Sequence, residues 1–201
     1  MLFYDTPDPA PNPRRVRLFA KAKGITLPTE TISIQAGEHK GEAYRAVNPL
    51  GQTPALVLDD GRVLTESVAI CRYLDAVHPE PPLFGRDPAE IGFVDMWIRR
   101  VELRLMTPVA MVWQHTHPFT ARVVVPQYKE FGESQRARAV NALREFDAAL
   151  ADRDWLVGDA PTMADIVLLS VIDFAGFIGL PLPEDASALR VWHARATERL
   201  A

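Results

Sequence analysis

A short proline-rich segment divides this chain and limits what either side of it can become. The stretch from His78 to Pro88 contains four prolines within eleven residues. Proline has no backbone N–H and a fixed φ, so this stretch can continue neither a helix nor a central strand. Signals for β-strands come before it and largely disappear after it. We therefore expect an α/β domain over 1–77, a linker over 78–88 and an all-α domain over 89–201.

The first part alternates between strand and helix signals. We expect a strand, a helix, a second strand, a hairpin and a second helix over residues 1–4, 12–24, 29–34, 54–64 and 65–77. Asn12 is the expected N-cap of the first helix, Gly24 its stop, and Thr65 the cap of the second. Two strands joined through a helix imply a parallel pair with a right-handed crossover.

The second part shows helical periodicity only. Helices are expected over residues 89–113, 133–150, 162–177 and 187–200. The third of these is apolar all round, which is typical of a helix buried in a core. Thr162 and Asp165 at its start have the spacing of a capping box, with Asp in place of the usual Glu or Gln. We interpret this pair as structural rather than catalytic.

Composition argues against several classes of function. The formal net charge is −4 and no basic stripe stands out, so neither nucleic acid nor an anionic membrane is an expected partner. The lone Cys71 cannot form an internal disulfide, and no apolar run approaches the roughly 20 residues that span a bilayer. The N-terminus lacks the pattern of a signal peptide. We therefore expect a cytoplasmic protein. We expect no metal site, since His115 and His117 are isolated.

Four segments carry a shared pattern: Pro11 to Val16, Asn48 to Leu56, Thr65 to Ile70 and Gly158 to Ile166. In this order and at this spacing they resemble the cytosolic-type glutathione transferases, bacterial members in particular, over essentially the whole chain. The resemblance implies a thioredoxin-like N-terminal domain followed by an all-helical domain. It also implies glutathione as the co-substrate and a homodimer.

The Gln52-Thr53-Pro54 segment is the expected docking site for the cysteinyl part of glutathione. The resemblance implies a cis Thr53–Pro54 bond, with the Thr53 backbone pointing outward to pair with an extended peptide. A trans proline at an edge strand is the alternative, because only about one X–Pro bond in twenty is cis.

Glu66 and Ser67 stand at a helix N-terminus, where free N–H groups and the helix dipole attract an anion. Ser67 suits the ligand's α-carboxylate and Glu66 its ammonium, which together match the γ-glutamyl end. The alternative is an ordinary capped first turn. His39 and Lys40 are candidates for the glycine carboxylate by position, and could equally be solvated loop residues.

The reactive end departs from the family pattern. A thiol with a pKa near 8.5 is only a few per cent ionised at pH 7, and lowering that pKa by two units takes about 2.7 kcal/mol. Where similar proteins commonly have Ser or Cys, this chain has Ala10. The nearest donors are Asn12, Thr6 and Tyr4. We favour Asn12, with Thr6 as a second donor, although Asn12 could merely cap the helix and Tyr4 fits a core position.

These residues predict a glutathione transferase that conjugates the thiolate to small hydrophobic electrophiles, a detoxification reaction. Candidates for the second-substrate wall are Met106, Trp113, His117 and Phe119, which could instead be core or dimer contacts. Two alternatives stay open: a glutathione-dependent peroxidase or disulfide reductase, and a non-catalytic binding protein of the same fold. A thioredoxin-type redox pair is excluded, because residues 10–13 contain no cysteine.

Overall fold

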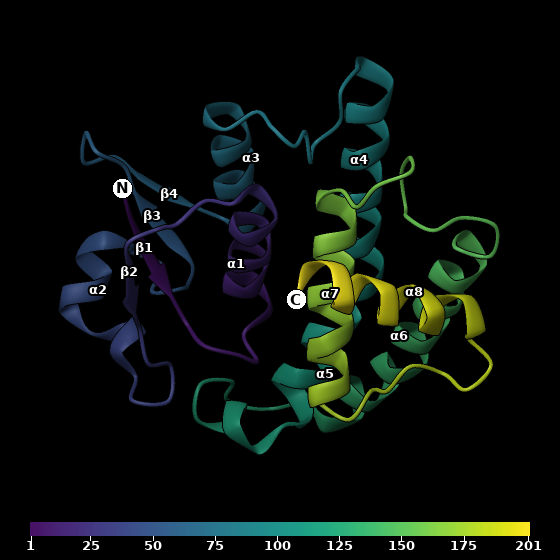
Figure 1. Ribbon diagram of the computed structural model, residues 1–201. Helices are drawn as coiled ribbons and strands as arrows, with labels where there is room; N and C mark the ends of the chain where they lie inside the picture. The colour runs from purple at the N-terminus through teal and green to yellow at the C-terminus, as the bar shows by residue number, and fades with distance from the viewer. The chain divides into compact units, whose positions relative to one another are not determined.

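The computed structural model describes residues 1–201, and the chain forms two compact units. The first spans Met1–Leu83 and the second Phe84–Arg199. The first unit combines a sheet with helices and the second is helical (Figure 1), as expected for the fold class. No helix combines the length and apolar character needed to cross a membrane.

A four-stranded mixed sheet forms the centre of the first unit. Its strands are β1 (Leu2–Asp5), β2 (Thr29–Thr31), β3 (Ala55–Val57) and β4 (Val63–Thr65), in the order β2-β1-β3-β4. The pair β1–β2 is parallel, as a strand–helix–strand order requires, and the β3–β4 hairpin is antiparallel. Ala55 lies opposite Tyr4 on one side and Thr65 on the other, which fixes the register where the site residues begin.

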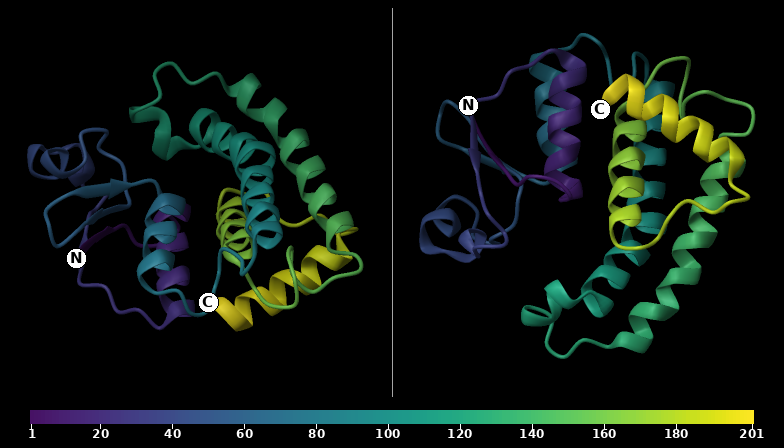
Figure 2. Two further views of the ribbon diagram at one scale, coloured as in Figure 1. Left: turned by 90° about the horizontal axis from the view of Figure 1, so that it is seen from above. Right: turned by 60° about the horizontal axis from the view of Figure 1, so that its bottom comes forward.

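Helices cover both faces of this sheet (Figures 1 and 2). The helices α1 (Pro11–Lys23) and α3 (Ser67–Val77) pack together on one face, and α2 (Glu42–Val47) lies on the other. A 3₁₀ turn, η1 (Glu38–Lys40), precedes α2. The sequence did not predict α2 or η1, because such short pieces show no clear helical period.

The second unit is built from five α-helices and two short helical pieces. These are α4 (Pro88–Arg100), the π-helix η2 (Val101–Met106), α5 (Thr107–Thr116), the 3₁₀ turn η3 (Pro118–Arg122), α6 (Lys129–Ala149), α7 (Met163–Phe177) and α8 (Ser187–Leu200). Nearly every residue of α7 is buried, and α7 contacts α4 and η2. The expectation of a helix buried all round is therefore confirmed.

Local interactions explain where the elements differ from expectation. The helix predicted over 89–113 contains a π-helical turn, where the Thr107 hydroxyl donates to the Glu102 carbonyl at 3.0 Å. Pro108 favours this turn, because it lacks the N–H that an α-helix would use there. The strand expected to reach Ile34 ends at Thr31, since the Ser33 amide turns to donate to the Glu38 carboxylate at 2.6 Å.

Candidate active site

The loop before Pro54 is held by two side chains that converge on one carbonyl. The Tyr44 hydroxyl donates to the Gln52 carbonyl oxygen at 2.6 Å, and the Asn48 side-chain amide donates to the same oxygen at 2.7 Å. Burial raises the pKa of Tyr44 to about 12, so the hydroxyl remains a donor at neutral pH. Because Tyr44 lies in α2 and Asn48 directly follows it, this short helix fixes the backbone of Gln52.

Thr53 has a free backbone and a tethered side chain. Its peptide bond to Pro54 is cis, as the resemblance implies. The Thr53 amide and carbonyl form no hydrogen bond within the chain, whereas its hydroxyl lies 2.8 Å from that of Thr6. Unpaired backbone beside a sheet can accept an extended peptide as an added strand. This position can therefore hold a peptide-like ligand.

His39 and Lys40 pack against the same loop. Lys40 Nζ donates to the carbonyl oxygens of Leu50 at 3.1 Å and Gly51 at 2.8 Å. Gly51 has a φ of +57°, and a Cβ atom there would lie 2.5 Å from the His39 carbonyl oxygen, so only glycine fits. Burial, and then the charge of Lys40, lowers the pKa of His39, which favours a neutral imidazole.

The start of α3 has an unusual backbone. The N-cap residue is Glu66, whose φ of 65° costs roughly 1–3 kcal/mol in a non-glycine residue. The prediction that Thr65 caps this helix is wrong, because Thr65 is still paired in β4. Ser67 is buried, and its hydroxyl accepts a hydrogen bond of 3.3 Å from Arg15. Arg15 is also buried, although a long arginine side chain on a helix is usually solvated.

The start of α1 offers a single backbone donor. Ala10 is the N-cap residue and has no side-chain cap, so the interpretation of Asn12 as the N-cap is wrong. Pro11 and Pro13 have no N–H, and the Arg14 amide is bonded to the Ala10 carbonyl at 3.3 Å. Asn12 therefore supplies the only free N–H of the first turn. The Asn12 side chain is half-buried and has no partner within the chain.

Arginine side chains tie down the loop between β1 and α1. Arg17 donates to the Asp5 carboxylate at 2.6 Å and to the Thr6 carbonyl at 2.9 Å. Arg14 and Arg17 both pair with Asp8. Burial raises the pKa of Asp5, and the Arg17 charge opposes that shift. Two arginine side chains of α1 thus hold the loop that leads to Asn12.

Three of the four residues predicted for a second-substrate wall come together in the second unit. The Trp113 ring lies 4.1 Å from His117 and 5.8 Å from Phe119, measured between ring centroids. Two rings of α7 that the sequence reasoning missed join them: Phe174 at 5.5 Å and Phe177 at 6.0 Å from Trp113. The sequence could not identify this pair. Because α7 is apolar on all sides, its pattern does not distinguish aromatic residues in the core from aromatic residues that line a site.

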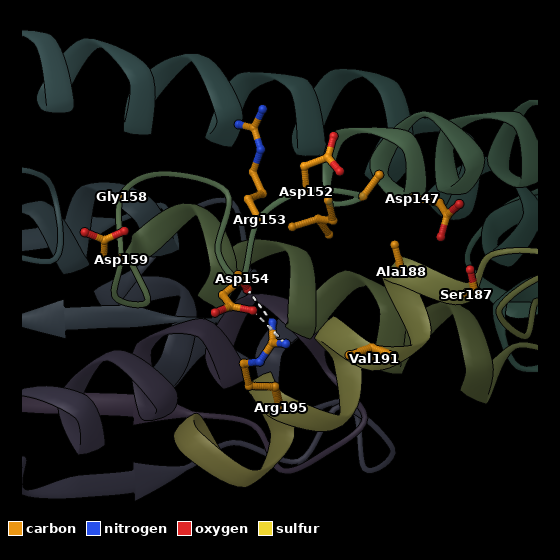
Figure 3. Close-up of a pocket in the computed structure, with 12 residues that line it drawn as sticks. Asp147, Asp152, Arg153, Asp154, Gly158, Asp159, Ser187, Ala188, Val191 and Arg195 are labelled. Atoms are coloured by element: carbon orange, nitrogen blue, oxygen red, sulfur yellow. Dashed lines mark hydrogen bonds and ion pairs between the residues drawn. The ribbon is translucent and has the colours of Figure 1, made fainter.

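Met106, the fourth predicted residue, is the half-buried last residue of η2. A separate hollow of about 740 Å³ lies between the end of α6, the following loop and the start of α8 (Figure 3). Charged side chains line it, with Arg195 bonded to the Asp154 carboxylate at 2.8 Å and to its carbonyl at 2.9 Å. None of the predicted site residues lines this hollow, and its charges suit an apolar substrate poorly.

Cys71 lies fully buried in α3, and burial raises the pKa of its thiol well above the usual value. It therefore cannot act as a nucleophile in this state. No group of three or more His, Cys, Asp or Glu side chains comes together in a way that could hold a metal ion.

Comparison with known proteins places both units in one family. The model described as the N-terminal domain of glutathione S-transferase matches residues 10–77, and the model for its C-terminal domain matches residues 95–195. The chain is similar to glutathione S-transferase 2 of Saccharomyces cerevisiae, at 37% identity over 99% of this chain and 86% of that protein. It is 32% identical to a maleylacetoacetate isomerase of Pseudomonas aeruginosa, over 84% of this chain and 78% of that protein.

Solved structures agree with the sequence matches. The crystal structure of Gtt2 from Saccharomyces cerevisiae superposes with a TM-score of 0.92 at 36% identity, covering 100% of both chains. A glutathione S-transferase domain-containing protein from Marinobacter aquaeolei gives a TM-score of 0.93 at 33% identity, covering 99% of this chain and 98% of that chain.

Proposed function

This chain belongs to the glutathione S-transferase family and is a glutathione transferase, and from that premise we propose that glutathione lies between Thr53 and Ser67. The register of the β3–β4 hairpin is the observation that carries this proposal. Ala55, the first residue of β3, pairs with Thr65, the last residue of β4, so Thr53 and Ser67 each lie two residues beyond the same end of the hairpin. This register supports a ligand that uses the free Thr53 backbone and the N-terminus of α3 together.

The γ-glutamyl end fits the start of α3. Its carboxylate would accept from the Ser67 amide and hydroxyl, near the positive end of the helix dipole. Glu66 is exposed, so its carboxylate is available to the ligand's ammonium. The strained φ of Glu66 supports this role, because such strain is concentrated at binding sites.

For the glycine carboxylate we propose His39 and Lys40, beside the loop that ends at Gln52. Lys40 uses two of its three ammonium protons on the Leu50 and Gly51 carbonyls, which leaves one for a ligand. An anion beside His39 would favour the imidazolium form and so gain a second charged partner.

Activation of the thiol is assigned to Asn12. A two-unit drop of the thiol pKa takes about 2.7 kcal/mol. A helix N-terminus supplies about 0.3–1 kcal/mol, and a hydrogen bond to a charged group about 1.5–3 kcal/mol. Since Asn12 carries both the free backbone N–H and a free side-chain amide at the start of α1, the upper parts of these two ranges together reach the required stabilisation without a Ser, Cys or Tyr.

For the electrophile we propose an apolar wall formed by the aromatic rings around Trp113, with His117, Phe119 and Met106. We assign a role to each part of the chain in turn: the domain over residues 1–77 binds glutathione, the segment over 78–88 links the two domains, and the domain over 89–201 supplies this wall.

We also propose a cytoplasmic homodimer that detoxifies electrophiles. The dimer rests on the family resemblance, and the compartment fits a buried cysteine without a disulfide partner.

The deciding experiment is a titration of glutathione into the pure protein, with thiolate absorbance followed against pH. We expect binding at millimolar glutathione and a thiol pKa well below 8.5. Absence of binding would refute the proposed site. Binding with an unshifted thiol pKa would favour the non-catalytic alternative, and turnover with peroxides or disulfides but not with aromatic halides would favour a peroxidase or reductase.

A further inference from the structure

Two threonine hydroxyls link the glutathione-docking residue to the segments that directly follow strands β1 and β2. The Thr6 hydroxyl donates to the Ile32 carbonyl oxygen at 3.0 Å and lies 2.8 Å from the Thr53 hydroxyl. Thr6 directly follows β1 and is buried, and Thr53 is half-buried. Ile32 lies 26 residues after Thr6 in the sequence, and Thr53 lies 47 residues after it, so only the folded sheet brings the three together.

The direction of these hydrogen bonds follows from the partners. A backbone carbonyl only accepts, so the bond to Ile32 uses the single proton of the Thr6 hydroxyl. The Thr53 hydroxyl must then donate to Thr6, which has a lone pair left. Neither hydroxyl keeps a proton for a ligand sulfur while this relay is intact.

We infer that Thr6 is a positioning residue, which fixes the Thr53 backbone through this relay instead of donating to the glutathione thiolate. Two further anchors support it: Arg17 holds the Thr6 carbonyl at 2.9 Å, and Tyr44 holds the Gln52 carbonyl at 2.6 Å. Thr53 is thus fixed from its side chain and from the residue before it. The inference rests on the proposed docking of glutathione at Thr53.

The test compares Thr6→Val, Thr53→Val and Thr6→Ser, which change the relay with little change of volume. We expect both valine variants to raise the KM for glutathione about three- to tenfold, as the loss of one neutral hydrogen bond would. The kcat should stay within about twofold, and its pH profile should not move, because no donor to the sulfur is lost. Thr6→Ser should restore the wild-type KM.

Thr31→Val is the matched control, because Thr31 is exposed at the end of β2 and its hydroxyl has no partner. The double variant Thr6→Val/Thr53→Val should be no worse than Thr6→Val alone, since both changes break one relay. A drop in kcat with an alkaline shift of its pH profile in Thr6→Val, but not in Thr53→Val, would show that Thr6 is a donor and overturn the inference.

An unchanged KM in Thr53→Val would also overturn it, even if Thr6→Val failed to fold. Failure of the underlying docking proposal looks different, because the wild-type protein itself would then not bind glutathione in direct titration.

Discussion

The indole N–H of Trp192 in α8 donates to the Asp165 carboxylate in α7 at 3.1 Å. The same carboxylate accepts from the Leu156 amide at 3.0 Å and the Thr162 amide at 2.9 Å. Burial raises the pKa of Asp165, although its four hydrogen bonds oppose that shift. The predicted capping residue thus joins the loop before α7, the start of α7 and the middle of α8.

Asp165→Ala should lower the free energy of unfolding by roughly 3–5 kcal/mol, because it leaves several buried donors without an acceptor. Urea denaturation of the variant and the wild type measures this loss. Asp159→Ala is the control, since Asp159 is exposed in the same region and has no hydrogen-bond partner. A loss below about 1 kcal/mol for Asp165→Ala would contradict the role of this carboxylate.

Gly51→Ala should disrupt the loop from Asn48 to Pro54, which we propose binds glutathione. The new Cβ would meet the His39 carbonyl at 2.5 Å in a backbone with φ +57°. We expect a stability loss of about 1–3 kcal/mol, together with weaker binding of glutathione in calorimetry. Gly61→Ala separates the two causes, because Gly61 also has a positive φ but open space around it. Equal binding losses in both variants would argue against a specific contact at residue 51.

Asn12→Ala should raise the pKa of the bound glutathione thiol while leaving affinity nearly unchanged. Loss of one hydrogen bond to a charged sulfur corresponds to about one to two pKa units. Thiolate absorbance of the bound complex against pH gives the value directly. Asn12→Asp is a useful second variant, because a carboxylate in the same volume should raise the thiol pKa further. If neither change moves the thiol pKa, another group activates it.

Protein stability should fall on the acid side of neutrality because of His39. Its pKa is lowered below 6.5, and its buried Nδ1 has no hydrogen-bond partner. As pH falls, the unfolded chain therefore binds a proton before the folded chain does. The contribution of neutral His39 to the free energy of unfolding is fully present above about pH 6.5, and it is lost as pH falls through the lowered pKa of His39 in the folded state.

Unfolding free energies at about pH 5 and about pH 7.5 measure this effect, with His39→Gln as the comparison. The difference between the two pH values should be smaller in the variant. An identical difference in both proteins would show that other groups cause the acid loss.

Parts of both units could be predicted from sequence because their signals are local. The β3–β4 hairpin has a turn sequence at Asp59-Asp60-Gly61, and the capping-box spacing of Thr162 and Asp165 is three residues long. The N-cap residues of α1 and α3 could not be predicted. Asn12 and Thr65 have side chains that suit an N-cap. However, α1 already begins at Pro11, one residue before Asn12, and α3 begins only at Ser67, because Thr65 is still paired in β4.

The sequence by itself determined the order of the longer strands and helices, the proline-rich segment that precedes the purely helical part and the motif residues around Thr53 and Ser67. These depend on backbone chemistry within a few residues. Only the tertiary structure decided that Thr6 bonds to Thr53, that Arg15 reaches Ser67 and that Trp192 reaches Asp165. These partners lie 27 to 52 residues apart, and a hydrogen bond between them forms only once packing of the sheet and helices has brought the donor to its acceptor.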